Sequence, residues 1–256
     1  MPRTLSLIRS ALAGGLLFPA LSEAAYDSGS TGADSVFNPQ VSTELALPPS
    51  GVFNFSSVNI PSGVSVTFKR NAANTPVVML VLGNVAIAGT LNLSGAAAPA
   101  VGAAGDGNIG DDGLPGKGGP GGFDGGADGS NGTDKRGGAG LGPGAGGGGA
   151  KFTDGYDGRT GGAGGGFGVA GSTPNIWIYS PGNTGIGGSV YGTEGLLPLI
   201  GGSGGGGGAG GAFLGGGGGG GGGGILIAAN GTVSVTGSLL ANGGKGADSA
   251  GDGEGI

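Results

Sequence analysis

The chain has 256 residues, of which 74 are glycine and 14 are proline, and it contains neither cysteine nor histidine. The absence of thiols and imidazoles excludes disulfide frameworks, Cys/His zinc sites and catalytic devices built on those two side chains. With 10 basic and 16 acidic residues the net charge is −6, which argues against nucleic acid and anionic membranes as partners.

Residues 1–24 have the pattern of a secretory signal peptide. Arg3 and Arg9 provide a positive start, Ala11–Phe18 is a short apolar core, and Ser22-Glu23-Ala24 places small residues three and one before a cleavage point. An amphipathic first helix is the competing interpretation. The segment is too short to span a bilayer, and no later stretch is long and apolar enough. We therefore expect a secreted or cell-surface protein, with a net charge of −7 from 8 basic and 15 acidic residues after cleavage.

The polar stretch of residues 25–50 contains three prolines and predicts an exposed lead-in. A first β-rich block follows at residues 51–94. Within it, Val64, Val66 and Phe68 alternate with polar residues, which is typical of a half-buried strand.

The same block ends with a second apolar stretch, residues 77–93. It opens with a continuous apolar run, turns at Gly83-Asn84, and then alternates. Short β segments punctuated by glycine and asparagine favour an all-β fold of the parallel β-solenoid (β-helix) type, whose rungs stack their inward side chains.

An internal repeat supports such stacking. Val85–Leu91 corresponds to Val233–Leu239, 148 residues further along, and Ile225–Ala229 parallels Met79–Leu82 upstream. The simplest arrangement places the two copies side by side, with the residues between them looping out. Residues 225–256 should therefore hold a second β-solenoid block and the start of a further glycine-rich stretch, as in a fragment of a longer protein.

Residues 95–224 form a large glycine-rich insertion. Glycine occupies every third position from Gly107 to Gly125, which is the period of a polyproline-II helix. A collagen triple helix would need more proline and an unbroken repeat, and a flexible linker would carry more serine. Packed polyproline-II-like strands fit best, with disorder as the remaining alternative. Because glycine loses much backbone entropy on ordering, a more stable core must template this lobe.

An apolar island, residues 173–200, interrupts the glycine. It holds Trp177, the only tryptophan, together with Tyr179 and Tyr191. The island predicts either a hydrophobic clip that closes the lobe onto the core or an exposed aromatic surface. In the second case these three side chains would bind surface glycans or other matrix proteins.

Aspartates in glycine turns are the candidate metal ligands, because calcium takes six to eight oxygens from flexible carboxylate loops. The spacing of calcium-binding nonapeptide repeats is absent, so solvated aspartates that keep a glycine surface soluble are the competing interpretation. No other cofactor is expected. The weak calcium candidates are Asp106, Asp111, Asp112, Asp124 and Asp128.

Catalytic residues are not expected. Lys117 is followed by Gly118, where a phosphate-binding loop would have serine or threonine. The charged pairs Lys69-Arg70 and Lys135-Arg136 lie at turns without the clustered carboxylates of β-helix lyases and hydrolases. The sequence therefore does not predict an enzyme.

Three stretches, Phe53–Pro61, Tyr191–Gly204 and Ile225–Gly244, resemble a group of uncharacterised, exported glycine-rich bacterial proteins. More loosely, the solenoid rungs resemble adhesin passenger domains. The resemblance implies a surface or matrix role and supplies no catalytic residues. We therefore expect a secreted structural or adhesive protein. The alternatives are an ice- or carbohydrate-binding module, suggested by small apolar positions such as Ala96-Ala97-Ala98, and then a β-helix polysaccharide lyase or hydrolase.

Overall fold

The computed structural model describes residues 26–102, 113–129, 136–150, 160–174, 185–210 and 214–248. All regular secondary structure in these residues is β, and none of them lies in a helix that could cross a membrane. The strands are β1 (Val36–Phe37), β2 (Thr43–Ala46), β3 (Val52–Phe55), β4 (Ser57–Ile60), β5 (Ser65–Lys69), β6 (Val77–Val81), β7 (Val85–Ile87), β8 (Thr90–Asn92), β9 (Ile225–Ala229), β10 (Val233–Val235) and β11 (Ser238–Leu240).

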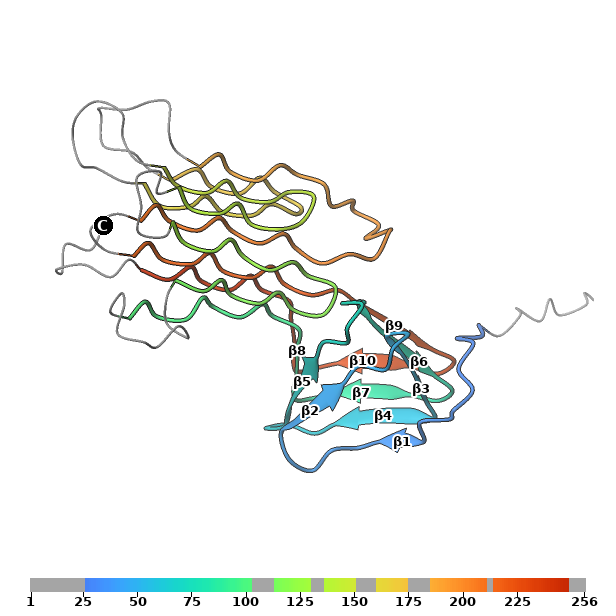
Figure 1. Ribbon diagram of the computed structural model, residues 1–256. Coiled ribbons are helices and arrows are strands. Elements are labelled where there is room, and N and C mark those ends of the chain that lie inside the picture. Colours follow the sequence, from blue (N-terminus) through green and yellow to red (C-terminus); the bar gives the residue numbers. More distant parts are fainter. Residues whose placement is uncertain are drawn as a thin grey trace, which may run out of the picture.

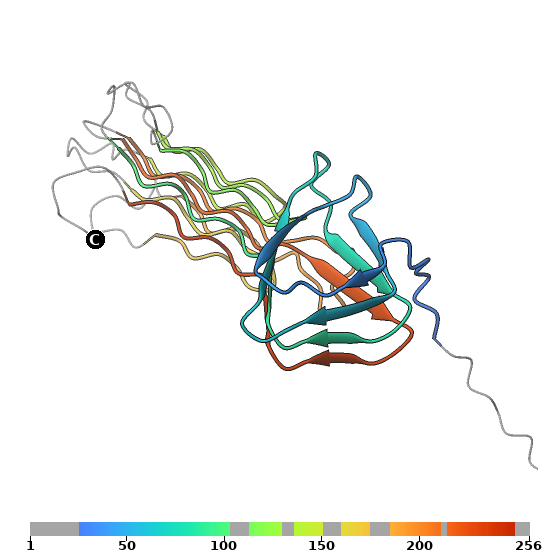
Figure 2. The same cartoon turned by 90° about the horizontal axis from the view of Figure 1, so that it is seen from below.

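The strands form three parallel sheets, ordered β1-β4-β7-β10, β2-β5-β8-β11 and β3-β6-β9. The chain visits the three sheets in turn, so each strand pairs with the strand three places later in the sequence (Figure 1). One turn through the sheets, for example β4-β5-β6, is called a rung below. This arrangement is all-β and compatible with the expected β-solenoid (Figure 2).

The core lies between the sheets. It is filled by every second side chain along each strand, the one that points inward. Ile60, Met79 and Leu91 are at most 1% exposed, because side chains alternate between the two faces of a strand and one face of each sheet is enclosed. The predicted alternation of Val64, Val66 and Phe68 with polar neighbours is confirmed, since all three are buried.

Strand pairing confirms the internal repeat. β10 pairs with β7 so that Val233 lies beside Val85, and β11 pairs with β8 so that Leu239 lies beside Leu91. The residues between the two copies leave the stack after β8 and return at β9 (Figure 1).

The expected alignment of Ile225 with Met79 is wrong by two residues. Ile225 instead pairs with Val77, which keeps the same offset of 148 found for the other two strands. A shift of two leaves the inward and outward faces unchanged, so apolar pattern alone does not distinguish the two registers. The following turn does, because the Gly231 N–H donates to the Gly83 carbonyl and the Thr232 N–H to the Asn84 side-chain oxygen.

Residues 25–50, predicted as an exposed lead-in, contain two strands of the first rung, β1 and β2. Parallel pairing with β4 and β5 recruits them although they are short and lie in a polar stretch. Phe37 contributes an aromatic ring and stacks on Phe55 with the ring centroids 5.3 Å apart.

The glycine-rich residues run as extended segments that lie side by side and project from the strands (Figures 1 and 2). They hold each other through backbone N–H···O bonds rather than through strand ladders. Residues 241–248, which follow β11, run along the same lobe, where Gly244 donates its N–H to the Gly220 carbonyl.

Candidate functional site

The central segment of the lobe, residues 201–210, donates its N–H groups to three neighbours in rotation. Successive N–H groups point in different directions, and each direction returns at every third residue. The donor–acceptor pairs are Gly202, Gly205 and Gly208 to Gly222, Gly219 and Gly216; Ser203, Gly206 and Ala209 to Gly166, Ala163 and Thr160; and Gly204 and Gly207 to Leu141 and Gly138, at N···O distances of 2.8–3.3 Å.

Close packing explains why most positions of this segment are glycine. A Cβ atom on Gly206 would overlap the carbonyl of Gly147, and one on Gly204 would overlap that of Asp124. Gly205 is different, because a Cβ there would have its nearest neighbour at an ordinary 3.4 Å. Gly204 and Gly206 therefore tolerate no side chain, whereas the side of the segment that Gly205 shares with Gly202 and Gly208 is open.

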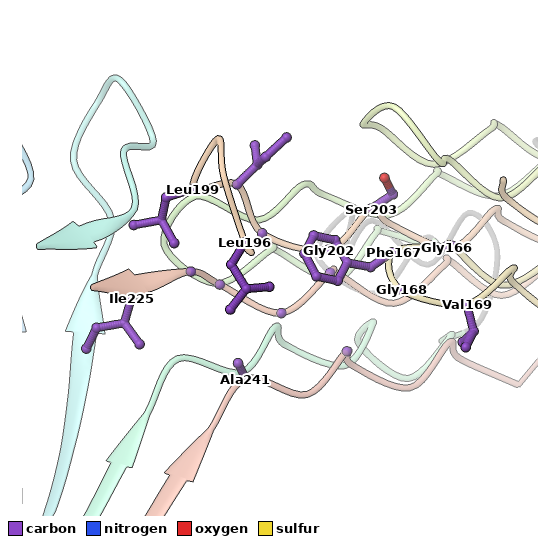
Figure 3. Close-up of a pocket in the computed structure, with 18 residues that line it drawn as sticks. Gly166, Phe167, Gly168, Val169, Leu196, Leu199, Gly202, Ser203, Ile225 and Ala241 are labelled. Carbon is purple, nitrogen blue, oxygen red and sulfur yellow. The ribbon is translucent and has the colours of Figure 1, made fainter. Parts of the chain in front are cut away.

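That open direction leads into a groove on the lobe. The groove consists of two adjoining hollows of about 390 and 300 Å³. Its walls come from segments near residues 162–169, 199–206 and 241–246, and residues 218–225 line it between them. Figure 3 shows the larger of the two hollows.

The backbone at the base of the groove has unused donors. The N–H groups of Gly218 and Gly221 donate to Gly126 and Phe123 on the far side. Within the described part of the chain, the N–H groups of Gly216, Gly219 and Gly222 make no backbone hydrogen bond. These three lie at the same three-residue spacing, so one whole side of segment 214–224 is left available for pairing.

The larger hollow has an apolar lining. Leu196, Leu199 and Ile225 line it on the side of the strands, and Phe167 and Val169 line it farther along the lobe (Figure 3). Val169 and Leu196 are 77% and 52% exposed. This hollow could accept an apolar group, whereas the other is lined by glycine backbone together with Ala163 and Ser203.

Of the candidate binding residues, Tyr191 lies in the described part of the chain, and Trp177 and Tyr179 lie outside it. The Tyr191 ring packs edge-on against Phe167 at 5.3 Å, and its hydroxyl donates to the Gly201 carbonyl. Burial raises the pKa of Tyr191, and a hydrogen bond with Ser203 opposes this rise. Tyr191 is half-buried, with its hydroxyl engaged inside the lobe.

Asp124 forms an ionic centre that joins the lobe to the strands. Its carboxylate oxygens lie 2.8 Å from the Arg70 guanidinium and 3.0 Å from the Lys117 ammonium, and one accepts the Gly118 N–H at 2.8 Å. Partial burial by itself raises the pKa of Asp124, but these three donors outweigh it and hold the pKa below the usual aspartate value. The oxygens proposed for calcium are thus engaged by protein donors.

Asp128 is the other calcium candidate that lies in the described part of the chain. The backbone N–H of Asp128 donates to the Gly113 carbonyl at 3.1 Å, and its side chain lies against Gly113. Asp106, Asp111 and Asp112 lie outside the described residues. Among the residues that the structure does describe, no three acidic side chains gather as a metal site.

The sequence analysis did not predict the groove. The period-three glycine pattern indicated extended packing, but it carried no sign of which side of a segment would stay open. Comparisons with protein-family models, with curated proteins and with solved structures gave no match.

Proposed function

We propose that the chain is an exported structural or adhesive protein of the cell surface or extracellular matrix, without catalytic activity. In this proposal a parallel β-solenoid is the base, and the glycine lobe is a bundle of polyproline-II-like strands that it presents. One observation carries the proposal: along segment 201–210 the backbone N–H groups point to the same neighbouring segment at every third residue. A polyproline-II helix has three residues per turn, so it produces this pattern.

Such a bundle is suited to a mechanical role. At about 3.1 Å per residue, segment 201–210 spans roughly 30 Å, and each of its neighbours supports it laterally. Gly206 and Gly207 are buried although they have no side chain, so the interior is backbone against backbone. A stiff projection of this kind, held out from a solenoid, would expose little flexible chain to proteases.

The proposed export depends on the N-terminal signal peptide. Residues 1–24 have the signal-peptide pattern and lie outside the described residues. Producing the full chain in a bacterial host and measuring the mass of the exported product tests it. Cleavage after Ala24 supports export, whereas a cytoplasmic product that retains its leader contradicts it.

Adhesion is tested on cells that display the chain. Cells displaying the native chain should be retained on a matrix-coated surface more strongly than cells displaying Gly206→Val, in which the central segment cannot pack. Antibody labelling must show equal surface amounts of the two chains. Equal retention at equal display would overturn the adhesive role of the lobe.

Two further measurements address the alternatives. Thermal hysteresis of a solution of the native chain would favour ice binding, and a reproducible signal on a glycan array would favour carbohydrate binding. For glycan binding Tyr191→Ala is the informative variant, because Tyr191 is the one aromatic candidate within the described part of the chain.

A further inference from the structure

Segment 113–119 of the lobe is held by backbone bonds that repeat every three residues. The N–H groups of Gly116 and Gly119 donate to carbonyls of segment 214–224 at 2.8 and 2.9 Å. That partner contains ten consecutive glycines. If segment 113–119 moved along it by three residues, Gly113 and Gly116 would make the same two bonds. The backbone bonds therefore do not determine the register, that is, which residues of the two segments lie side by side.

Close packing does not determine the register of this segment either. A Cβ atom on Gly116 would overlap the Ala96 carbonyl, and one on Gly119 would overlap the Leu93 carbonyl. After a shift by three, Gly113 and Gly116 would occupy these two places, so glycine would again meet both carbonyls. A polyproline-II helix has three residues per turn, so each residue would also keep its direction. The register must be set by a side chain.

The carboxylate of Asp124 distinguishes the two registers. It accepts the Gly118 N–H at 2.8 Å and lies 3.0 Å from the Lys117 ammonium. A shift by three would bring Pro115, which has no N–H, to the place of Gly118. The same shift would bring Leu114, which has no charge, to the place of Lys117. Both contacts of Asp124 with this segment would therefore be lost in the shifted register.

The corner between β5 and β6 holds Asp124 in place relative to the strands. The Arg70 guanidinium lies 2.8 Å from the Asp124 carboxylate. The Asn74 amide donates to the Gly122 carbonyl at 2.6 Å, and its oxygen accepts the Gly121 N–H at 3.2 Å. These contacts fix the turn that leads into Asp124, so its carboxylate has a defined position against the strand stack.

We propose that Asp124 sets the register of segment 113–119, and that Arg70 and Asn74 are positioning residues through which the strand stack imposes it. Glycine contacts that repeat every three residues permit several alignments, and this carboxylate selects one of them. The lobe thereby has a single arrangement although most of its contacts are between identical residues. This inference stands independently of the adhesive role, because it concerns only how the lobe is aligned.

The test is the alignment of the segment in solution, measured by nuclear magnetic resonance on the full chain. The Ala96 N–H donates to the Lys117 carbonyl at 2.7 Å, so NOE contacts of the Ala96 amide report the register. The native chain should show Lys117 beside it in one set of signals. Asp124→Ala should add a second set with Leu114 in that place. The ratio of shifted to native register should rise about tenfold or more, because hydrogen bonds to a charged group are lost.

Two controls separate alignment from stability. Asp124→Asn keeps a side-chain oxygen that can accept the Gly118 N–H, so it should retain one register. Gly206→Ala should loosen the lobe, because its methyl group would overlap the Gly147 carbonyl, but it leaves Asp124 in place and should also retain one register. Arg70→Gln is a second variant, which removes the ion pair that anchors Asp124 and should show the same shifted form in a smaller amount.

Circular dichroism must show that each variant keeps the β fold. A single native register in Asp124→Ala would overturn the proposal. A lobe that loses its hydrogen-exchange protection without a second register would also overturn it, because Asp124 would then supply stability alone. A shifted form in Gly206→Ala would show that any loosening permits the shift, which contradicts a specific role of Asp124. A single register in Arg70→Gln would overturn the part assigned to the strand stack.

Discussion

The strand stack and the glycine lobe are stabilised in opposite ways. The stack encloses large side chains such as Ile60 and Met79, and each such burial contributes about 1.5–3 kcal/mol. The lobe encloses backbone, and the net contribution of each backbone hydrogen bond to stability is only about 0.5–1.5 kcal/mol. The loss of backbone conformational entropy on folding costs about 1–2 kcal/mol for each residue, and more for glycine. The lobe is therefore the weaker part and depends on the stack to which it is attached.

The largest expected effect comes from Leu91→Ala in the stack. Leu91 is fully buried and lies between Val66 and Leu239 of the adjacent rungs, so the cavity should lower the free energy of unfolding by about 2–5 kcal/mol. Urea denaturation measures the loss. Hydrogen exchange should show that amides of the lobe lose protection together with those of the strands.

The control for this change is Leu226→Ala, which truncates a leucine that is 48% exposed on β9 and should cost less than about 1 kcal/mol. If the Leu91→Ala variant weakens the strands while the lobe keeps its full protection, then the lobe is stable without the stack.

A smaller effect, confined to the lobe, is expected from Gly206→Ala. The new methyl group would overlap the carbonyl of Gly147, so the lobe should lose about 1–3 kcal/mol through overpacking. Gly205→Ala is the matched control one residue away, where the nearest atom lies at 3.4 Å. Because alanine has less freedom in the unfolded chain, Gly205→Ala should be neutral or stabilise by up to about 1 kcal/mol.

Hydrogen exchange distinguishes these two glycine variants from a global effect. Lobe amides should exchange faster in Gly206→Ala, and the amides of β4–β8 should be unchanged. Equal behaviour of the two variants would show that the three-residue rotation of contacts does not hold in solution.

The strand stack could be predicted largely because its signals are local. Alternation at Val64, Val66 and Phe68 and the repeat at Val85 and Val233 both report side chains that must face one interior. β1 and β2 were missed because they are only two and four residues long and lie in a polar stretch, and they join the sheets through pairing with β4 and β5. The register of β9 against β6 is set by the turn that follows β9, whose Gly231 and Thr232 N–H groups bond to Gly83 and Asn84. The pattern of apolar residues is the same after a two-residue shift, so it could not predict this register.

The lateral packing of the lobe could not be predicted in the same way. Gly205 and Gly206 are identical in sequence, yet one faces the groove and the other faces the Gly147 carbonyl. The difference arises from which segments meet sideways, and a run of glycine encodes no preference among them. Asp124 is the informative exception, because its charge could be matched with Arg70 only once the lobe was placed beside the strands.

The smallest expected effect tests that ionic connection between the two regions. Asp124→Asn removes the charge that pairs with Arg70 and Lys117. At this partly exposed site the free energy of unfolding should fall by about 1 kcal/mol.

Because the folded protein holds the pKa of Asp124 below its ordinary 3.8, the stabilisation is fully present above that value and is lost as the pH falls through the lowered pKa. The stability difference between the native chain and the variant should therefore be constant near neutrality and vanish in acid. Asp248→Asn provides the comparison near neutrality, since Asp248 pairs with Lys245 at an exposed position where an ion pair contributes little to stability. A difference that persists unchanged below the lowered pKa would mean that the carboxylate's hydrogen-bond geometry, rather than its charge, joins the lobe to the strands.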